Sequence, residues 1–201
     1  MRGAPTAAVG VAENGNSAVL VTVAPDGKVL DRRSVELTQG LPTHPHHHEG
    51  SWALGRYPNT PKTRVPTLAE AVALVERVRD AAALGARESL AALAAAVPLP
   101  IAAVALRVCP ELPASIEARI SDNRAQTMAD SVMYREALAA AARERGWSVH
   151  WYDKERVLHD AAAALGRDSL DELLQAMGRV LGPPWQAKHK LAAAAALAVV
   201  R

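Results

Sequence analysis

The sequence predicts an α/β fold in which a run of strands comes first and strands then alternate with helices. Short runs of β-branched and small apolar residues lie between turn residues up to about residue 37, and apolar residues recur at helical spacing after about residue 66. Half of the 201 residues are apolar, which is enough to bury a sizeable core. We therefore expect one domain over residues 1–201, with helix packing that relies on small side chains because Phe is absent and Ala abundant.

The first part of the chain reads as two hairpins in a row. Each apolar run is followed by a turn, and the first turn contains Asn14-Gly15, a pair that readily supplies positive φ. The second turn contains Asp26-Gly27. In chain order the segments are strand 7–12, turn 13–16, strand 17–24, turn 25–27 and strand 28–37. Consecutive hairpins predict an antiparallel meander.

A long loop is expected at about 38–66, because Pro, His, Gly and Asn are frequent there and no period is sustained. His44, His46, His48 and Glu49 are candidate ligands for Zn²⁺, since imidazole and carboxylate groups suit that ion. Consecutive residues of an extended loop alternate in direction, so these groups need further ligands to meet one ion. A solvated loop is the alternative reading.

The same loop carries cationic and aromatic side chains. Arg56 and Lys62 lie near Trp52 and Tyr57, a combination suited to contacting phosphates and stacking on bases. An aromatic residue that covers the core is the alternative. These residues are therefore candidate nucleic-acid contacts.

Helices and buried strands alternate after the loop. Thr67 and Glu70 form a capping-box pattern at the start of the first helix, which Gly85 is expected to kink or split. The run 101–108 is apolar except for Arg107, as in a strand covered on both faces. The later elements are expected as helix 122–145, strand 147–152 and helices 153–165, 168–181 and 185–200.

This order resembles the RuvC-type branch of the ribonuclease H-like superfamily. The features that carry the resemblance are strand 7–12 with its Gly-containing turn, strand 103–108 and the Ala-rich last helix. The resemblance implies a five-stranded mixed sheet of order 3-2-1-4-5 flanked by helices. It also implies two-metal phosphodiester hydrolysis with Mg²⁺ or Mn²⁺ held by carboxylates.

The carboxylate positions of that family are changed in this chain. The acid of the first strand aligns with Ala12, and Glu13 follows it, where alternation along a strand turns the side chain to the other face unless the turn holds a bulge. The acid of the fourth strand aligns with Arg107. The nearest remaining acids are Glu111 and Glu117, and His189 is the one plausible ligand of the last helix. Glu13, Glu111, Glu117 and His189 are accordingly the candidate catalytic set.

In this chain, basic residues occupy positions at which the resemblance implies acidic residues. Arg107, Lys188 and Lys190 could bind a phosphate directly in place of metal ions, and Arg124 opens a polar helix expected to border the same edge. Ordinary surface ion pairing is the alternative. On helical spacing, Gln126, Asp130 and Tyr134 share one face of that helix.

Charge and cysteine content limit the function. The net charge is +2, so any binding of nucleic acid must come from a local patch. The single cysteine, Cys109, excludes an internal disulfide and fits a reducing compartment. No secretory signal pattern and no membrane-length apolar run is found, and we expect a cytoplasmic protein.

The sequence favours a nucleic-acid-associated domain with a degenerate or rebuilt site. Two alternatives stay open. The chain is a metal-dependent nuclease, or it is a non-catalytic interaction scaffold with a homodimeric or other protein partner.

Overall fold

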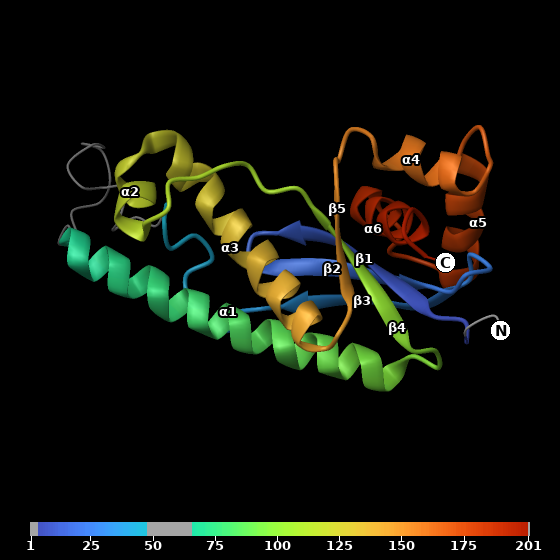
Figure 1. Ribbon diagram of the computed structural model, residues 1–201, viewed down its shortest axis with the longest axis horizontal. Coiled ribbons are helices and arrows are strands. Elements are labelled where there is room, and N and C mark those ends of the chain that lie inside the picture. Colours follow the sequence, from blue (N-terminus) through green and yellow to red (C-terminus); the bar gives the residue numbers. More distant parts are fainter. Residues whose placement is uncertain (1–3, 48–65, 201) are drawn as a thin grey trace.

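The computed structural model describes residues 4–47 and 66–200, in which a five-stranded sheet carries helices on both faces (Figure 1). The strands are β1 (Ala7–Asn14), β2 (Ser17–Val23), β3 (Val29–Glu36), β4 (Ile101–Arg107) and β5 (Ser148–Tyr152). They lie in the order β3-β2-β1-β4-β5. The β1–β2 and β2–β3 pairs are antiparallel and the β1–β4 and β4–β5 pairs are parallel, which confirms the expected mixed sheet.

The helices follow the predicted alternation, with one addition. They are α1 (Leu68–Ala96), α2 (Ile116–Ser121), α3 (Asn123–Glu144), α4 (Val157–Ala164), α5 (Asp171–Leu181) and α6 (Ala187–Leu197). The capping box at the start of α1 is confirmed, because the Glu70 amide donates to Thr67 Oγ1 at 3.3 Å and the Thr67 amide donates to Glu70 Oε2 at 2.8 Å. In the described part of the chain, no helix is long and apolar enough to cross a bilayer.

The expectation that Gly85 kinks or splits the first helix is wrong. Helix α1 runs through this residue without a break, with Ala82 and Ala86 buried on either side. A Cβ at Gly85 would collide with the carbonyl oxygen of Leu37. The glycine therefore allows the end of the β3 segment to approach the helix backbone, and it is not a break point.

Helix α2 was absent from the predicted order. Six residues are too few for a period to be read from the sequence, and the helix is defined by its cap and by one anchor. The amide of Ala118 donates to Ser115 Oγ at 3.1 Å, and Ile120 is buried. The predicted start of the next helix is correct, since Asp122 caps α3 by accepting from the Ala125 amide at 2.7 Å.

The last three helices are shorter than predicted. Before α4, Asp153 accepts from the Glu155 amide at 2.8 Å within a turn, and the helix begins only at Val157. Helix α6 begins after Gln186 because that residue forms its cap with His189.

The sheet separates two buried layers, with α1 and α3 on one face and α4, α5 and α6 on the other (Figure 1). Side chains of β1 alternate between them: Val9 and Val11 pack with α1 and α3, whereas Ala12 packs with the other layer. Gly10 lets α6 lie directly on β1, because a Cβ there would collide with the Ala192 carbonyl oxygen. The fold therefore fixes which face each side chain at the end of β1 occupies.

Candidate functional site

Glu13 points toward α3. The β1–β2 pairing is regular from Ala8 to Asn14 and holds no bulge, so the alternation of the strand continues to its end. Since Ala12 packs with α4 and α6, Glu13 faces the α1–α3 layer, as the alternation predicted. Ala12 and Glu13, the nearest acid to it, thus lie on opposite faces of the sheet.

Glu13 forms a buried ion pair with Arg135 of α3. Arg135 Nε lies 2.9 Å from Glu13 Oε1, and the two side chains are 6% and 7% exposed. The N–H of Nε is not aligned with the carboxylate, so this contact is an ion pair rather than a well-formed hydrogen bond. Arg135 Nη1 also donates to the carbonyl oxygen of Val108 at 2.6 Å. One guanidinium therefore joins the ends of β1 and β4 to α3.

Tyr152, at the end of β5, packs in the same layer as Ala12. Its hydroxyl donates to the carbonyl oxygen of Val11 at 2.7 Å. Burial raises the pKa of Tyr152 well above its ordinary value, and the charge of Glu13 raises it further, while Arg107 and Arg135 lower it. The hydroxyl therefore remains a neutral donor at physiological pH.

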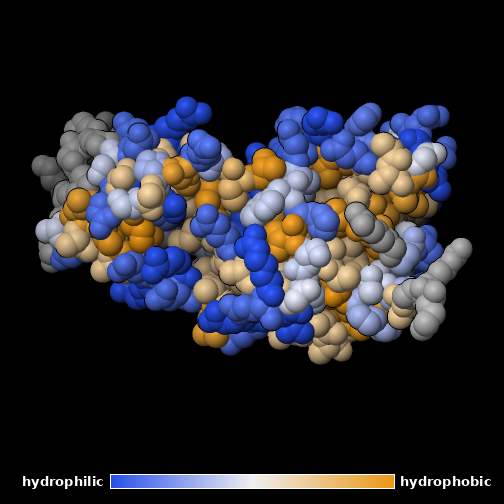
Figure 2. Space-filling model, in the orientation of Figure 1, coloured by the Kyte–Doolittle hydropathy of each residue, from blue (hydrophilic) through white to orange (hydrophobic). Residues whose placement is uncertain are grey.

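A cleft of about 420 Å³ opens beside these residues. Figure 2 shows the upper edge of the molecule hollowed between the α2–α3 part and the β5–α4 part. The cations Arg107 and Lys154 are exposed on this cleft and make no ion pair within residues 4–47 and 66–200. The cleft is lined by Arg107, Val108, Cys109, Pro110, Thr127, Met128, Ser131, Arg135, Asp153, Lys154 and Glu155.

Cys109 lies within this cleft. Its Sγ is 3.9 Å from Nη1 of Arg135. Burial raises the pKa of the thiol, and the charge of Arg135 opposes that rise. The sulfur is therefore a neutral thiol at physiological pH.

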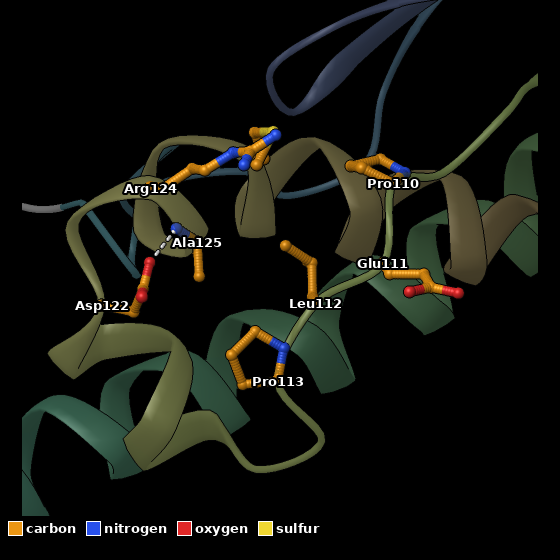
Figure 3. A pocket seen from close by; sticks show the side chains of 8 residues that line it. Pro110, Glu111, Leu112, Pro113, Asp122, Arg124 and Ala125 are labelled. Carbon is orange, nitrogen blue, oxygen red and sulfur yellow. Dashed lines mark hydrogen bonds between the residues drawn. The ribbon is translucent and has the colours of Figure 1, made fainter.

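A second hollow, of about 530 Å³, lies along the start of α3. Figure 3 shows Arg124 reaching from α3 across the top of this hollow, with Leu112 pointing into it from the opposite wall. Asp122 is occupied by its cap with Ala125, and Glu111 points away from both Asp122 and Arg124 (Figure 3). Arg124 and Glu111, predicted for different roles, thus line one hollow.

The described start of the His-rich loop contacts the same helix, α3. Asp130 Oδ1 accepts from the His46 amide at 3.0 Å and lies 2.7 Å from His46 Nδ1. Asp130 Oδ2 lies 3.7 Å from His44 Nδ1. The Tyr134 hydroxyl donates to the Thr43 carbonyl oxygen at 2.9 Å, and burial raises the pKa of Tyr134 to about 12. Residues 43–46 are therefore fastened to α3 by a buried carboxylate and a neutral phenol.

Several predicted site residues lie elsewhere or outside the described residues. His48, Glu49, Arg56 and Lys62 belong to the latter group. Lys188 is exposed at the start of α6 and Lys190 is half-buried, and neither lines the cleft with Arg107. Of these three cations, only Arg107 lines the cleft, and a shared phosphate contact of all three stays a prediction.

The positions of the candidate acids and of His189 do not fit a two-metal centre. His189 Nδ1 accepts from the Gln186 amide at 3.1 Å, and its ring lies 5.9 Å from that of Trp185. Burial and the nearby charge of Arg32 lower the pKa of His189. Glu111 and Glu117 are exposed. Within residues 4–47 and 66–200, no three His, Cys, Asp or Glu side chains gather closely enough to hold a metal ion. The catalytic role of Glu13, Glu111, Glu117 and His189 stays a prediction.

Arg135 is the main site residue that the sequence did not indicate. Helical spacing places it four residues after Ser131, which also lines the cleft. That spacing could have indicated that Arg135 lies on the same side of the helix as Ser131. An arginine on a polar helix is nevertheless interpreted as a surface residue unless the burial of the helix is known.

The sheet order and strand directions define a fold of the ribonuclease H-like class. No protein-family model and no curated protein matches the chain. Among solved structures, the chain is similar to Thermus thermophilus RuvC in complex with Holliday junction substrate, with 15% identity, 96% and 91% of the two chains covered and a TM-score of 0.49. It is also similar to another Thermus thermophilus RuvC structure, with 14% identity, 96% and 92% covered and a TM-score of 0.45.

Proposed function

We propose that this domain is nucleic-acid-associated and binds a phosphate-bearing ligand, without catalytic metal ions, in the cleft at the ends of β4 and β5. The observation that carries the proposal is the buried pair of Glu13 with Arg135 beside a cleft on which Arg107 and Lys154 make no ion pair with any described residue. A carboxylate neutralised by a guanidinium has no free charge to offer a metal ion. The remaining positive charge of the cleft is then available to an anion.

The basic side chains of the cleft differ in whether they are available to bind a ligand. Arg135 is held by Glu13 and by the Val108 carbonyl, so it shapes the wall. Arg107 and Lys154 are exposed, and a guanidinium offers donors in a geometry that suits a phosphate. Ser131 adds a hydroxyl to the lining. These groups can contact an anion without any rearrangement of the buried pair.

Two acids in the lining oppose this charge. Asp153 is engaged with the Glu155 amide, and Glu155 itself is exposed. The proposal therefore requires a ligand that reaches Arg107 and Lys154 at short range, because long-range attraction from a balanced surface is screened within about 8 Å at physiological ionic strength.

Fluorescence anisotropy with labelled DNA and RNA oligonucleotides, read across a salt titration, tests this function. We expect binding that weakens with salt, and a loss of about tenfold in affinity in each of the variants Arg107→Glu and Lys154→Glu. Arg167→Glu, on an exposed arginine outside the cleft lining, is the matched control and should retain wild-type affinity. Equal affinity in all three variants would overturn the proposal.

Two other results would replace it. Cleavage of DNA or RNA that depends on Mg²⁺ or Mn²⁺, and that is lost in Glu13→Gln and His189→Ala, would identify a nuclease. Absence of binding to every oligonucleotide at low salt, together with self-association or capture of a defined protein partner, would identify an interaction scaffold.

A further inference from the structure

The two hollows described above adjoin each other. Both are lined by Pro110 and Met128, so the hollow at the ends of β4 and β5 meets the hollow at the start of α3 at these two residues. Segment 108–113 forms one wall and the first half of α3 forms the other (Figure 3). We refer to this feature, bounded by these two walls, as the 108–113 groove.

Cations stand at both ends of the 108–113 groove. Arg107 and Lys154 line one end, and Arg124 lines the other. Arg124 and Arg135 are 11 positions apart on α3, which corresponds to about 16 Å along a helix axis at ~1.5 Å per residue. The groove is therefore longer than a single phosphate group and suits a chain that carries several.

The middle of the groove is apolar. Pro110 and Met128 line both halves, and Leu112 points into the second half (Figure 3). A base face or a sugar can cover such a surface, and the thioether of a methionine adapts to the shape of what it contacts. In a duplex the base faces are stacked on one another and are closed to this contact.

The acids of the second half do not block a phosphate near Arg124. Asp122 accepts from the Ala125 amide, and Glu111 points away from Arg124 (Figure 3). Arg124 makes no ion pair with any residue that the structure describes. Its charge is therefore free to meet a ligand that enters from the Arg107 end.

We propose that the 108–113 groove holds a single-stranded segment of nucleic acid, with phosphates at Arg107, Lys154 and Arg124 and with bases or sugars over Pro110, Leu112 and Met128. This inference rests on the proposed function, because the same cleft supplies the first phosphate contact. It adds that the ligand is a single strand of several nucleotides.

The test compares oligothymidylates of about two, eight and sixteen nucleotides by anisotropy on the full chain. We expect affinity to rise by about tenfold or more from two to eight nucleotides and then to level off. Arg124→Glu should remove this gain and leave the affinity for the dinucleotide unchanged. Arg143→Glu, an exposed arginine near the end of the same helix, should behave as wild type. A blunt duplex of the longer sequence should bind about tenfold more weakly than the single strand.

The outcomes separate the two proposals. Binding of the dinucleotide with no gain from length would overturn the groove and keep the proposed function. No binding to any oligonucleotide would overturn both. Duplex affinity equal to that of the single strand would also overturn the groove. So would equal binding of poly-glutamate, which would indicate a site for polyanions in general.

Discussion

Arg135 makes two interactions at the ends of β1 and β4, one with a carboxylate and one with a backbone carbonyl. It is buried, pairs with Glu13 and donates to the Val108 carbonyl. A buried ion pair contributes little net stability because desolvation offsets the Coulomb attraction, but each partner needs the other. Removal of one charge is therefore expected to be much more costly than removal of both.

The Glu13–Arg135 pair gives the first prediction. Arg135→Met leaves a buried unpaired carboxylate and should destabilise the fold by about 3–5 kcal/mol. The double variant Glu13→Leu with Arg135→Met should recover most of that loss. Urea unfolding followed by circular dichroism measures both.

Arg143→Met, on an exposed arginine of the same helix, is the control and should change stability by less than about 0.5 kcal/mol. An equal loss in the single and the double variant would show that the pair is held by packing and not by charge.

The direction of Glu13 could be predicted from strand alternation, but its partner could not. Helix α3 is buried on several sides, by the sheet, by α1 and by residues 43–46. A helix covered in this way shows no clear polar and apolar face, so the sequence does not mark Asp130 and Arg135 as buried. Their burial depends on neighbours that are distant in the chain.

At the scale of elements, helix α3 carries several of the polar side chains that form the candidate site. Asp130 and Tyr134 hold residues 43–46, Arg135 holds the ends of β1 and β4, and Arg124 lines the groove. The helix start at Asp122 was readable because capping is local. The convergence of these groups on one helix was not, because it requires the sheet.

The contact of α6 with β1 gives the second prediction. A Cβ at Gly10 would collide with the carbonyl oxygen of Ala192 and would lie 2.6 Å from the Ala196 amide nitrogen, both of which are backbone atoms. Gly10→Ala should therefore displace the helix and cost about 3 kcal/mol. It should also increase hydrogen exchange in α6 and β1 ahead of the rest of the sheet.

Ala102→Val, at an exposed position of β4, serves as the control for a substitution within a strand and should be close to neutral. Unchanged stability and unchanged exchange in Gly10→Ala would show that α6 can shift away from β1 at little cost.

At the scale of the whole molecule, the meander and the last helices are joined directly. Arg32 of β3 donates to the carbonyl oxygens of Gly182 and Pro184, at 2.9 Å and 2.7 Å. These residues lie between α5 and α6. Charged donors to backbone carbonyls are among the stronger hydrogen bonds, so this contact helps fix α6 on the sheet.

Arg32→Met is the third prediction. It removes both bonds and should destabilise the fold by about 2 kcal/mol. Arg33→Met is a matched control on the same strand, because Arg33 pairs only with Asp31 among the described residues and that contact is local. It should cost less than about 1 kcal/mol. Urea unfolding of both variants provides the comparison, and equal losses would contradict a long-range role for Arg32.

The sequence by itself determined the order of the strands, the meander and the facing of Glu13, because turn chemistry, capping and alternation are set by residues close together in the chain. Tertiary structure alone decided that Arg135 meets Glu13, that Asp130 holds His46 and that segment 108–113 and α3 enclose one groove. Those contacts depend on how far each helix is shifted and rotated on the sheet. Packing of the complete core sets that position, and no local pattern encodes it.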